Sequence, residues 1–206
     1  MEIPKIEYAS EAEIKAFQEK KLRDTITYIG KNSSFYKKIF QQHSIDPAGV
    51  LTLEDLRKIP TTTKEDLEKF NNDFICAPKR NIIDYCNTSG TLGSPVNIPL
   101  TERDLQRLAY NEAISFAGAG CTSEDIFQLT TTIDKRFMAG LAYFEGARML
   151  GAGFVRVGPG VPELQWKTIK EIEPTVLIAV PSFLLKLTEY AIRKGIDYKN
   201  TNITKA

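Results

Sequence analysis

Residues 154–194 read FVRVGPGVPELQWKTIKEIEPTVLIAVPSFLLKLTEYAIRK, in which short apolar runs alternate with longer amphipathic ones. The apolar runs 154–158 and 175–180 have the length of β-strands. Pro162 and Pro181 follow them, and proline is favoured in the first turn of a helix. The stretch therefore predicts strand, helix, strand and helix, which is typical of a parallel sheet covered on both faces.

The same alternation extends upstream and predicts an α/β fold for residues 81–206. A strand at 126–130 precedes a helix at 137–150, which Gly151 is expected to end. Two further strands, 81–86 and 96–100, flank a loop of small residues. A helix from Thr101 follows, with its apolar face formed by Leu105, Leu108, Ala109, Ala113, Phe116 and Ala117. We expect βαβ units with right-handed crossovers. After the helix that ends at residue 194 the alternation would require another strand, but residues 195–206 are polar and interrupt the pattern.

The first 80 residues predict helices instead. An apolar stripe at helical spacing predicts a first helix with Gly30 as its stop, and 33–40 predict a second. Thr52 and Thr63 each precede an Asp by three residues, a helix-start pattern. We therefore expect a helical segment, 1–80, before the α/β portion, 81–206. The stripe is formed by Ile14, Phe17, Leu22, Ile26 and Ile29.

Composition excludes several classes of function. Lys and Arg number 27 and Asp and Glu 26, so the net charge of +1 gives no reason to expect nucleic acid or an anionic membrane as partner. The longest apolar run is interrupted by Pro181, so no membrane-spanning helix is expected. The first residues lack the pattern of a secretory signal, so a cytoplasmic location is expected. Cys76, Cys86 and Cys121 lack metal-ligand spacing, and His43 is the only histidine, so no metal site is expected.

Residues 85–100, YCNTSGTLGSPVNIPL, place hydroxyls and glycines between two strand-like runs. Hydroxyls and glycine backbone with positive φ supply the convergent donors that phosphate oxygens need. A P-loop would need Lys before Ser or Thr and then a helix, whereas Ser94 and Pro95 lead into a strand. The alternative is an ordinary hairpin turn rich in such residues. The candidate phosphate-binding residues are Thr88, Ser89, Gly90, Thr91 and Gly93.

The segment NTSGTLGSPV, residues 87–96, resembles the phosphate loop of the adenylate-forming enzymes. More narrowly, the chain resembles their phenylacetate–CoA ligase branch. Four other segments carry this resemblance, in the order of the family, and with the loop they span nearly the whole chain. They are KLRDTITYIGKNSSFYKKIF, LTLEDLRKIPTTTKEDL, GLAYFEGARMLGAG and EPTVLIAVPSFLLKLTEYAIRKGID.

The resemblance implies the N-terminal part of an acyl-CoA synthetase-like large domain, within a ligase that uses ATP, Mg2+ and coenzyme A. Such enzymes form an acyl-adenylate and then a thioester, and the loop residues would hold the β- and γ-phosphates. Leu92 replaces the usual second Thr, and Ser94 stands where Lys is common. The catalytic residues are expected beyond residue 206, so this chain alone is expected to be inactive.

The resemblance also implies a pocket for the acid, with an aryl acid expected. Phe137 matches an aromatic position of that pocket, although a core role on its helix is an equal alternative. Thr132, Ile133 and Asp134 stand where the aryl-acid ligases tend to be aromatic, so the acid stays open. Cys86, beside the loop, is expected to be a strand residue that faces the core.

Two other functions remain as alternatives. One is an adenylyl-transferring relative with a non-CoA acceptor, such as the ligases that modify a deazaflavin coenzyme. The other is a non-catalytic scaffold, which the departures at Leu92 and Ser94 would favour. The expected partners are a small carboxylic acid and a nucleotide. An unpaired sheet edge would also favour a homodimer.

Overall fold

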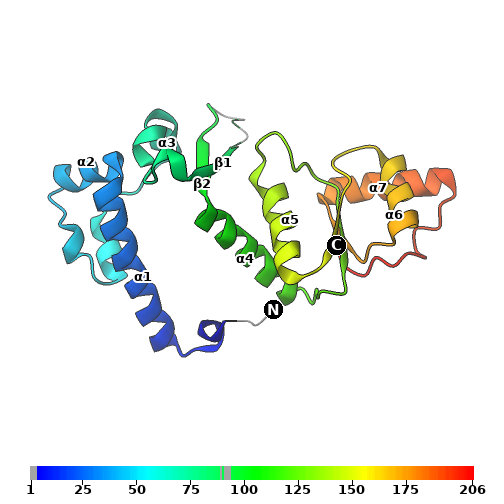
Figure 1. The fold of residues 1–206 in the computed structure, drawn as a ribbon, viewed down its shortest axis with the longest axis horizontal. Helices are drawn as coiled ribbons and strands as arrows, with labels where there is room; N and C mark the ends of the chain where they lie inside the picture. Colours follow the sequence, from blue (N-terminus) through cyan, green and yellow to red (C-terminus); the bar gives the residue numbers. More distant parts are fainter. Residues whose placement is uncertain (1–3, 89, 91–93) are drawn as a thin grey trace. The chain divides into compact units, whose positions relative to one another are not determined.

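The computed structural model describes residues 4–88, 90 and 94–206. The chain divides into two compact units, one within Glu2–Thr101 and the other Glu102–Ala206, and each is described by itself (Figure 1). The first unit holds the helical segment and an antiparallel hairpin. The second holds the parallel sheet. The domain boundary expected near residue 80 stays a prediction.

The first unit is built from three α-helices, whose starts are capped by side chains. Thr63 and Asp66 form the predicted reciprocal capping box at the start of α3, and Ser10 and Glu13 form another at the start of α1. The helices are α1 (Glu11–Asn32), α2 (Ser34–Gln42) and α3 (Lys64–Lys69). Short 3-10 helices join them: η1 (Lys5–Tyr8), η2 (Pro47–Gly49), η3 (Glu54–Lys58), η4 (Asn71–Phe74) and η5 (Lys79–Asn81).

Helix α1 corrects one prediction, because it runs past Gly30 and ends at Asn32. A Cβ on Gly30 would lie 3.2 Å from both Phe40 Cε2 and Pro47 Cγ. Glycine is therefore needed there for close packing and does not end the helix. The change of direction comes at Ser33, whose side chain accepts a hydrogen bond from the backbone N–H of Tyr36 and caps α2.

The apolar stripe of α1 packs onto α2 and the segment that follows it. Ile26 is buried there with Phe40 and Val50, and Leu22 and Ile29 pack against this cluster. Phe17, which the spacing placed on the same stripe, is instead 43% exposed. The first unit therefore rests on a small core and needs other contacts to hold its loops.

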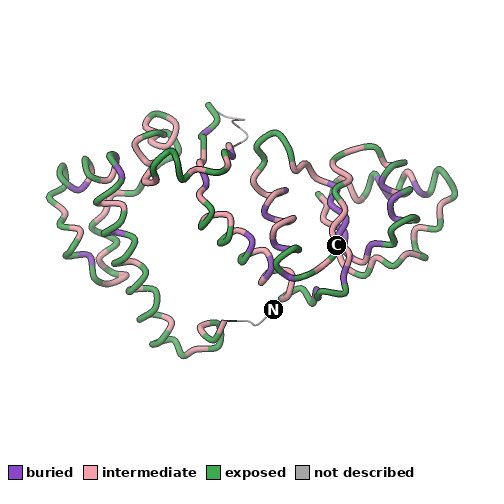
Figure 2. Tube along the Cα trace, viewed as in Figure 1, coloured by how far each residue is buried: buried purple, intermediate pink, exposed green. Residues whose placement is uncertain are grey.

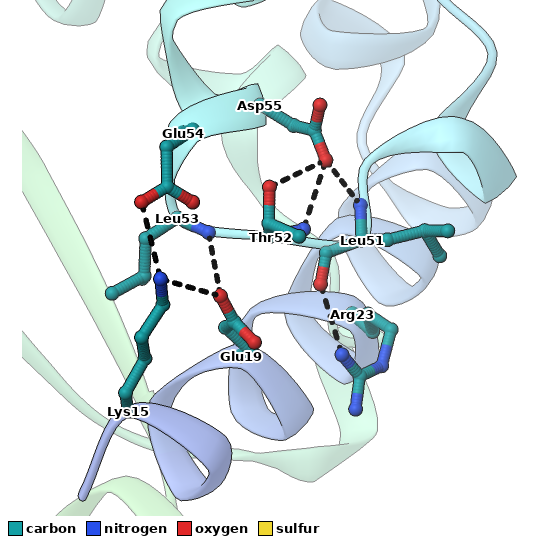
Figure 3. A network of polar contacts seen from close by, with 8 residues as sticks. All are labelled: Lys15, Glu19, Arg23, Leu51, Thr52, Leu53, Glu54 and Asp55. Carbon is teal, nitrogen blue, oxygen red and sulfur yellow. Dashed lines mark hydrogen bonds and ion pairs between the residues drawn. The ribbon is translucent and has the colours of Figure 1, made fainter. Parts of the chain in front are cut away.

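A network of polar contacts supplies such support between α1 and residues 51–55 (Figure 3). One carboxylate oxygen of Asp55 accepts from the backbone N–H groups of Leu51 and Thr52 at 3.0 and 2.9 Å. Arg23 donates to the Leu51 carbonyl at 2.9 Å, and Lys15 reaches Glu54 at 3.2 Å. These contacts tie an otherwise irregular segment to the helix.

The hairpin of the first unit consists of β1 (Ile82–Asn87) and β2 (Asn97–Thr101), which pair antiparallel. Its open end is held by Asn71, which donates from Nδ2 to the Asn97 carbonyl at 2.9 Å and accepts from the Asn97 N–H at 3.0 Å. The candidate phosphate loop joins these two strands, so Asn71 fixes its base.

The second unit confirms the predicted α/β fold. Its strands form one parallel sheet in the order β4-β3-β5. Helices α4 and α5 lie on one side of the strands, and α6 and α7 on the other (Figure 1). The elements are α4 (Glu102–Gly118), β3 (Ile126–Leu129), α5 (Met138–Leu150), β4 (Gly153–Arg156), α6 (Pro162–Ile172), β5 (Val176–Ile178) and α7 (Pro181–Lys194). Gly151, with φ of 85°, ends α5 as expected.

The core of this unit lies on both faces of the sheet, and Figure 2 shows its buried residues along the strands. Phe127 is fully buried and packs with Ala147 and Leu150. On the opposite face Leu177 packs with Ile169 and Leu187. The central strand β3 thus presents the apolar side chain of Phe127 to the layer formed by α4 and α5.

After α7 the described residues form no further strand, only an isolated bridge to β5. The N–H of Leu177 donates to the Lys205 carbonyl at 2.9 Å, and Val176 and Lys205 form a parallel bridge. The Lys205 ammonium also lies 3.1 Å from Asp125 Oδ1. This edge of β5 is therefore paired.

Candidate functional site

The loop after β1 begins with Thr88, and its first contacts extend the hairpin. The Thr88 N–H donates to the Val96 carbonyl at 3.1 Å, and the Val96 N–H donates to the Thr88 hydroxyl oxygen at 3.1 Å. A hydroxyl that accepts one hydrogen bond still has its own O–H to donate. Thr88 therefore sits where the strands part, with a hydroxyl fixed in place.

Gly90 adopts φ of 63°, in the left-handed region that the sequence pattern anticipated. Such a residue lets the backbone turn sharply without the steric cost that a side chain would add. The other predicted phosphate-binding residues, Ser89, Thr91 and Gly93, lie outside the described residues, as does Leu92.

The strand beneath the loop is anchored in apolar surroundings. Cys86 is buried on β1, which confirms its predicted place in the core. Burial, and then the nearby Asp84 carboxylate, raise the pKa of the Cys86 thiol to about 11. The thiol therefore stays protonated at neutral pH and offers no nucleophile.

A second candidate region is the carboxyl edge of the parallel sheet, because ligands of open α/β sheets bind beyond the carboxyl ends of the strands. Hydrogen bonds join the three strand ends here. The Thr130 N–H and hydroxyl both donate to the Ile178 carbonyl at 2.9 Å. The Gly158 N–H donates to the Leu129 carbonyl at 3.0 Å. The loops that follow β3, β4 and β5 are thereby brought to one edge.

The loop after β3 carries backbone strain. Lys135 and Arg136 adopt φ of 56° and 60°, a conformation that costs energy for residues other than glycine. The Thr132 hydroxyl donates to Asp134 within the same loop. Gly140 of α5 lies against this loop, and a Cβ there would fall 2.8 Å from Ile133 Cα. The loop is held tightly between strand and helix.

Phe137, the predicted pocket residue, immediately precedes α5 and is 42% exposed. That exposure places it outside the buried core of its unit, at the edge where the loop from β3 ends. Thr88 and Gly90 belong to the first unit, and Phe137 to the second. Their common role at one site stays a prediction.

The loop after β4 contains functional candidates that the sequence reading missed. Gly158, Gly160 and Val161 adopt φ of 82°, 77° and 45°. The Gln165 amide donates to the Gly158 and Gly160 carbonyls at 2.7 and 3.3 Å. The available signal was the Gly-Pro-Gly run after a strand, which marks a loop but does not reveal the glutamine that holds it.

Within residues 4–88, 90 and 94–206, no group of three His, Cys, Asp or Glu side chains is placed to hold a metal ion. None of the helices in the described part of the chain is long and apolar enough to cross a membrane.

Comparison with solved structures identifies the class of fold. A 2-hydroxyisobutyryl-CoA ligase, crystallised in complex with 2-HIB-AMP and CoA, superposes with a TM-score of 0.86 at 22% identity, over 94% of this chain and 43% of that one. The open conformation of the ligase gives a TM-score of 0.84. The fold is that of an acyl-CoA ligase.

Comparison with curated proteins narrows the relationship. The phenylacetate-coenzyme A ligase of Escherichia coli (strain K12) is 31% identical over 185 residues, 89% of this chain and 42% of that protein. The one from Thermus thermophilus is 28% identical over 204 residues, 98% of this chain and 46% of that protein. No family model matches. The chain is thus similar to phenylacetate-coenzyme A ligases, as the sequence predicted, and it spans less than half the length of these relatives.

Proposed function

We propose that this chain is the N-terminal part of an ATP-dependent carboxylic acid–CoA ligase. The observation that carries the proposal is the similarity to phenylacetate-coenzyme A ligases over 89% and 98% of the chain. The hairpin loop with Thr88 at its base and Gly90 at positive φ adds a local feature suited to phosphate oxygens. The reaction would form an acyl-adenylate first and a CoA thioester second.

In this reaction the loop acts by positioning and charge stabilisation. Hydroxyls and backbone N–H groups of the five loop residues would hold the β- and γ-phosphates of ATP while the carboxylate attacks the α-phosphorus. Mg2+ would enter with the phosphates, whose charge it offsets. The loop residues are Thr88, Ser89, Gly90, Thr91 and Gly93.

The acid is proposed to bind at the carboxyl edge of the parallel sheet. Phe137 is exposed at this edge and offers an aromatic face to the acid. The preceding Thr132 and Asp134 are polar, so the pocket would combine one aromatic contact with hydrogen-bonding groups. An aryl acid that also carries a polar substituent fits this combination best.

The proposal is tested with a joined ligase, which we define as residues 1–206 fused to the C-terminal part of the Escherichia coli relative. Acid-dependent release of pyrophosphate from ATP is measured for the joined ligase and for this chain alone. We expect release from the joined ligase only. Thioester formation with and without CoA then separates an acid–CoA ligase from an adenylyl-transferring relative.

A matched pair of glycine variants tests the phosphate loop. Gly90 and Gly120 both adopt positive φ, at 63° and 77°, so valine strains the backbone at either position. A Cβ on Gly120 would meet nothing within 4 Å. Gly90→Val should lower pyrophosphate release by about 100-fold, whereas Gly120→Val should leave it nearly unchanged. Equal losses in the two variants would contradict a role of this loop in phosphate binding.

A further inference from the structure

The loop Gly158–Val161, which leads into α6, contains three residues with positive φ. Gly158 and Gly160 adopt φ of 82° and 77°, and Val161, which is not glycine, adopts 45°. Left-handed backbone at a residue with a branched side chain costs free energy and persists only where its surroundings hold it. Something must therefore hold this loop in place.

The holding group is the side chain of Gln165, on the first turns of α6. Gln165 is fully buried, and its Nε2 donates to the carbonyls of Gly158 and Gly160 at 2.7 and 3.3 Å. The amide nitrogen of glutamine has two N–H bonds, so it can serve both carbonyls at once. Gly158 is also fixed from its other side, because its N–H donates to the Leu129 carbonyl at 3.0 Å.

A second buried amide orients the first. Gln128, at the centre of the sheet on β3, donates from Nε2 to the Gln165 side-chain oxygen at 2.7 Å. Both glutamines are fully buried. Burying two amides in place of apolar side chains costs free energy unless their hydrogen bonds are made, and the Gln128 oxygen has no partner among the described residues. The position of the loop Gly158–Val161 explains the two buried amides better than a contribution to the stability of the fold does.

The loop lies beside the proposed acid site. The Gly158 N–H donates a hydrogen bond to the carbonyl of Leu129, the last residue of β3. The segment that leads from β3 to Phe137 begins directly after Leu129. Any change in the path of Gly158–Val161 would therefore alter the carboxyl edge next to that connection. The loop itself presents Val161, whose side chain is exposed.

We propose that Gln165 is a positioning residue for the carboxylic acid. It holds Gly158–Val161 as one wall of the acid subsite, without touching the acid itself, and Gln128 orients it for this task. The inference rests on the proposed ligase function, and it adds a specificity determinant to it. Neither a methionine nor a glutamate at position 165 can reproduce the contacts, because neither side chain can donate two hydrogen bonds.

The kinetic test uses Gln165→Met in the joined ligase, with Gln106→Met as the matched control. Gln106 is exposed on α4, where it contacts Glu102, so its loss leaves the sheet untouched. We expect Gln165→Met to raise the KM for the acid about tenfold or more, while the KM for ATP changes less than twofold. Gln128→Met should raise the KM for the acid by a smaller factor, since Gln165 then keeps its donors but loses its orientation.

Hydrogen exchange of the 206-residue chain provides an independent readout. In Gln165→Met the backbone amides of residues 158 to 164 should exchange at least about tenfold faster, with the amides of β3 and α5 unchanged. Uniformly faster exchange throughout the unit would show a merely structural role and would overturn the inference. So would an acid KM within twofold of the unsubstituted enzyme.

The failure of this inference differs from a failure of the proposed function. Absence of acid-dependent turnover in the unsubstituted joined ligase contradicts the ligase proposal. The positioning of Gly158–Val161 by Gln165 is then decided by the exchange rates alone, and unchanged rates in Gln165→Met would overturn it.

Discussion

The two units of this chain hold their loops by different means. In the first unit, charged side chains that water still reaches bind the backbone of residues 51–55, as the partly exposed Asp55 does for Leu51 and Thr52 (Figure 3). In the second unit, buried side chains hold a loop instead, because the Gln165 amide donates hydrogen bonds to the carbonyls of Gly158 and Gly160. Water competes with exposed polar contacts and hardly with buried ones, so the two units should respond very differently to substitution.

The largest effect is expected in the core of the second unit. Phe127→Ala removes a fully buried ring that projects from β3 onto Ala147 and Leu150 of α5, and it should lower the free energy of unfolding by about 3–5 kcal/mol. Phe17→Ala in α1, where the ring is 43% exposed, is the control and should change it by less than about 0.5 kcal/mol. Urea unfolding followed by circular dichroism measures both. Similar losses would show that the comparison of the units is wrong.

A smaller effect is expected where α4 and α5 touch. Gly146 lies against Glu112 and the backbone of Ala113, where an added Cβ would fall 3.1 Å from the Ala113 nitrogen. Gly146→Ala should therefore push the helices apart and cost about 1–3 kcal/mol, despite the higher helix propensity of alanine. Gly118→Ala, with open space around its Cβ, provides the control. Equal stability of the two variants in urea would contradict the close packing of these helices.

A pH-dependent effect is expected at Asp125. Burial opposes its ionisation, but hydrogen bonds from Thr175 and the Thr122 N–H, together with the Lys205 ammonium, outweigh burial and lower the pKa. A carboxyl with a lowered pKa stabilises the fold above its unfolded pKa of about 4, and this stabilisation is lost as the pH falls through the folded pKa.

The measurement is the urea midpoint of the 206-residue chain between pH 7 and pH 3. Asp125→Asn should be less stable than the unsubstituted chain at pH 7, and the two midpoints should converge as the pH falls below 4. Lys205→Met should also reduce the pH dependence, because the ammonium lies 3.1 Å from Asp125. A constant difference between Asp125→Asn and the unsubstituted chain would rule out the ionised carboxyl as the cause.

The smallest effect is expected at the surface network of the first unit. Lys15 joins Glu54 and Glu19 through exposed ion pairs, so Lys15→Met should leave the urea midpoint unchanged within error. Asp55→Ala should lower it measurably, since three hydrogen bonds to Leu51 and Thr52 are lost. If Lys15→Met lowered the urea midpoint more than Asp55→Ala, ion pairs and not hydrogen bonds to the backbone would hold residues 51–55.

Much of the fold could be predicted because its signals are local. Strand-like runs separated by helices indicate the parallel sheet. Thr63 begins α3 through a hydrogen bond of its own side chain, and Gly151 ends α5 through its own positive φ. Gly30 misled the prediction because its role depends on Phe40 and Pro47, which lie further along the chain. A residue that serves a distant contact has no local signal.

The same reasoning separates the two candidate loops. The loop at Thr88 could be proposed from the sequence because the hydroxyls and glycines that would bind phosphate are its own residues. The loop at Gly158 depends on Gln165 and Gln128, and a glutamine within a helix or a strand looks like any surface residue until its burial is known. A sequence motif can therefore suggest residues for direct ligand contact, whereas the proposed positioning residues Gln165 and Gln128 were found only from their burial and hydrogen bonds.

The most direct test of the ligase assignment is acid-dependent pyrophosphate release, measured on the joined ligase and on the 206-residue chain. We expect release from the joined ligase in the presence of ATP, Mg2+ and a carboxylic acid, and none from the chain alone. Release that needs no acid, or that occurs equally with the 206-residue chain, would contradict it.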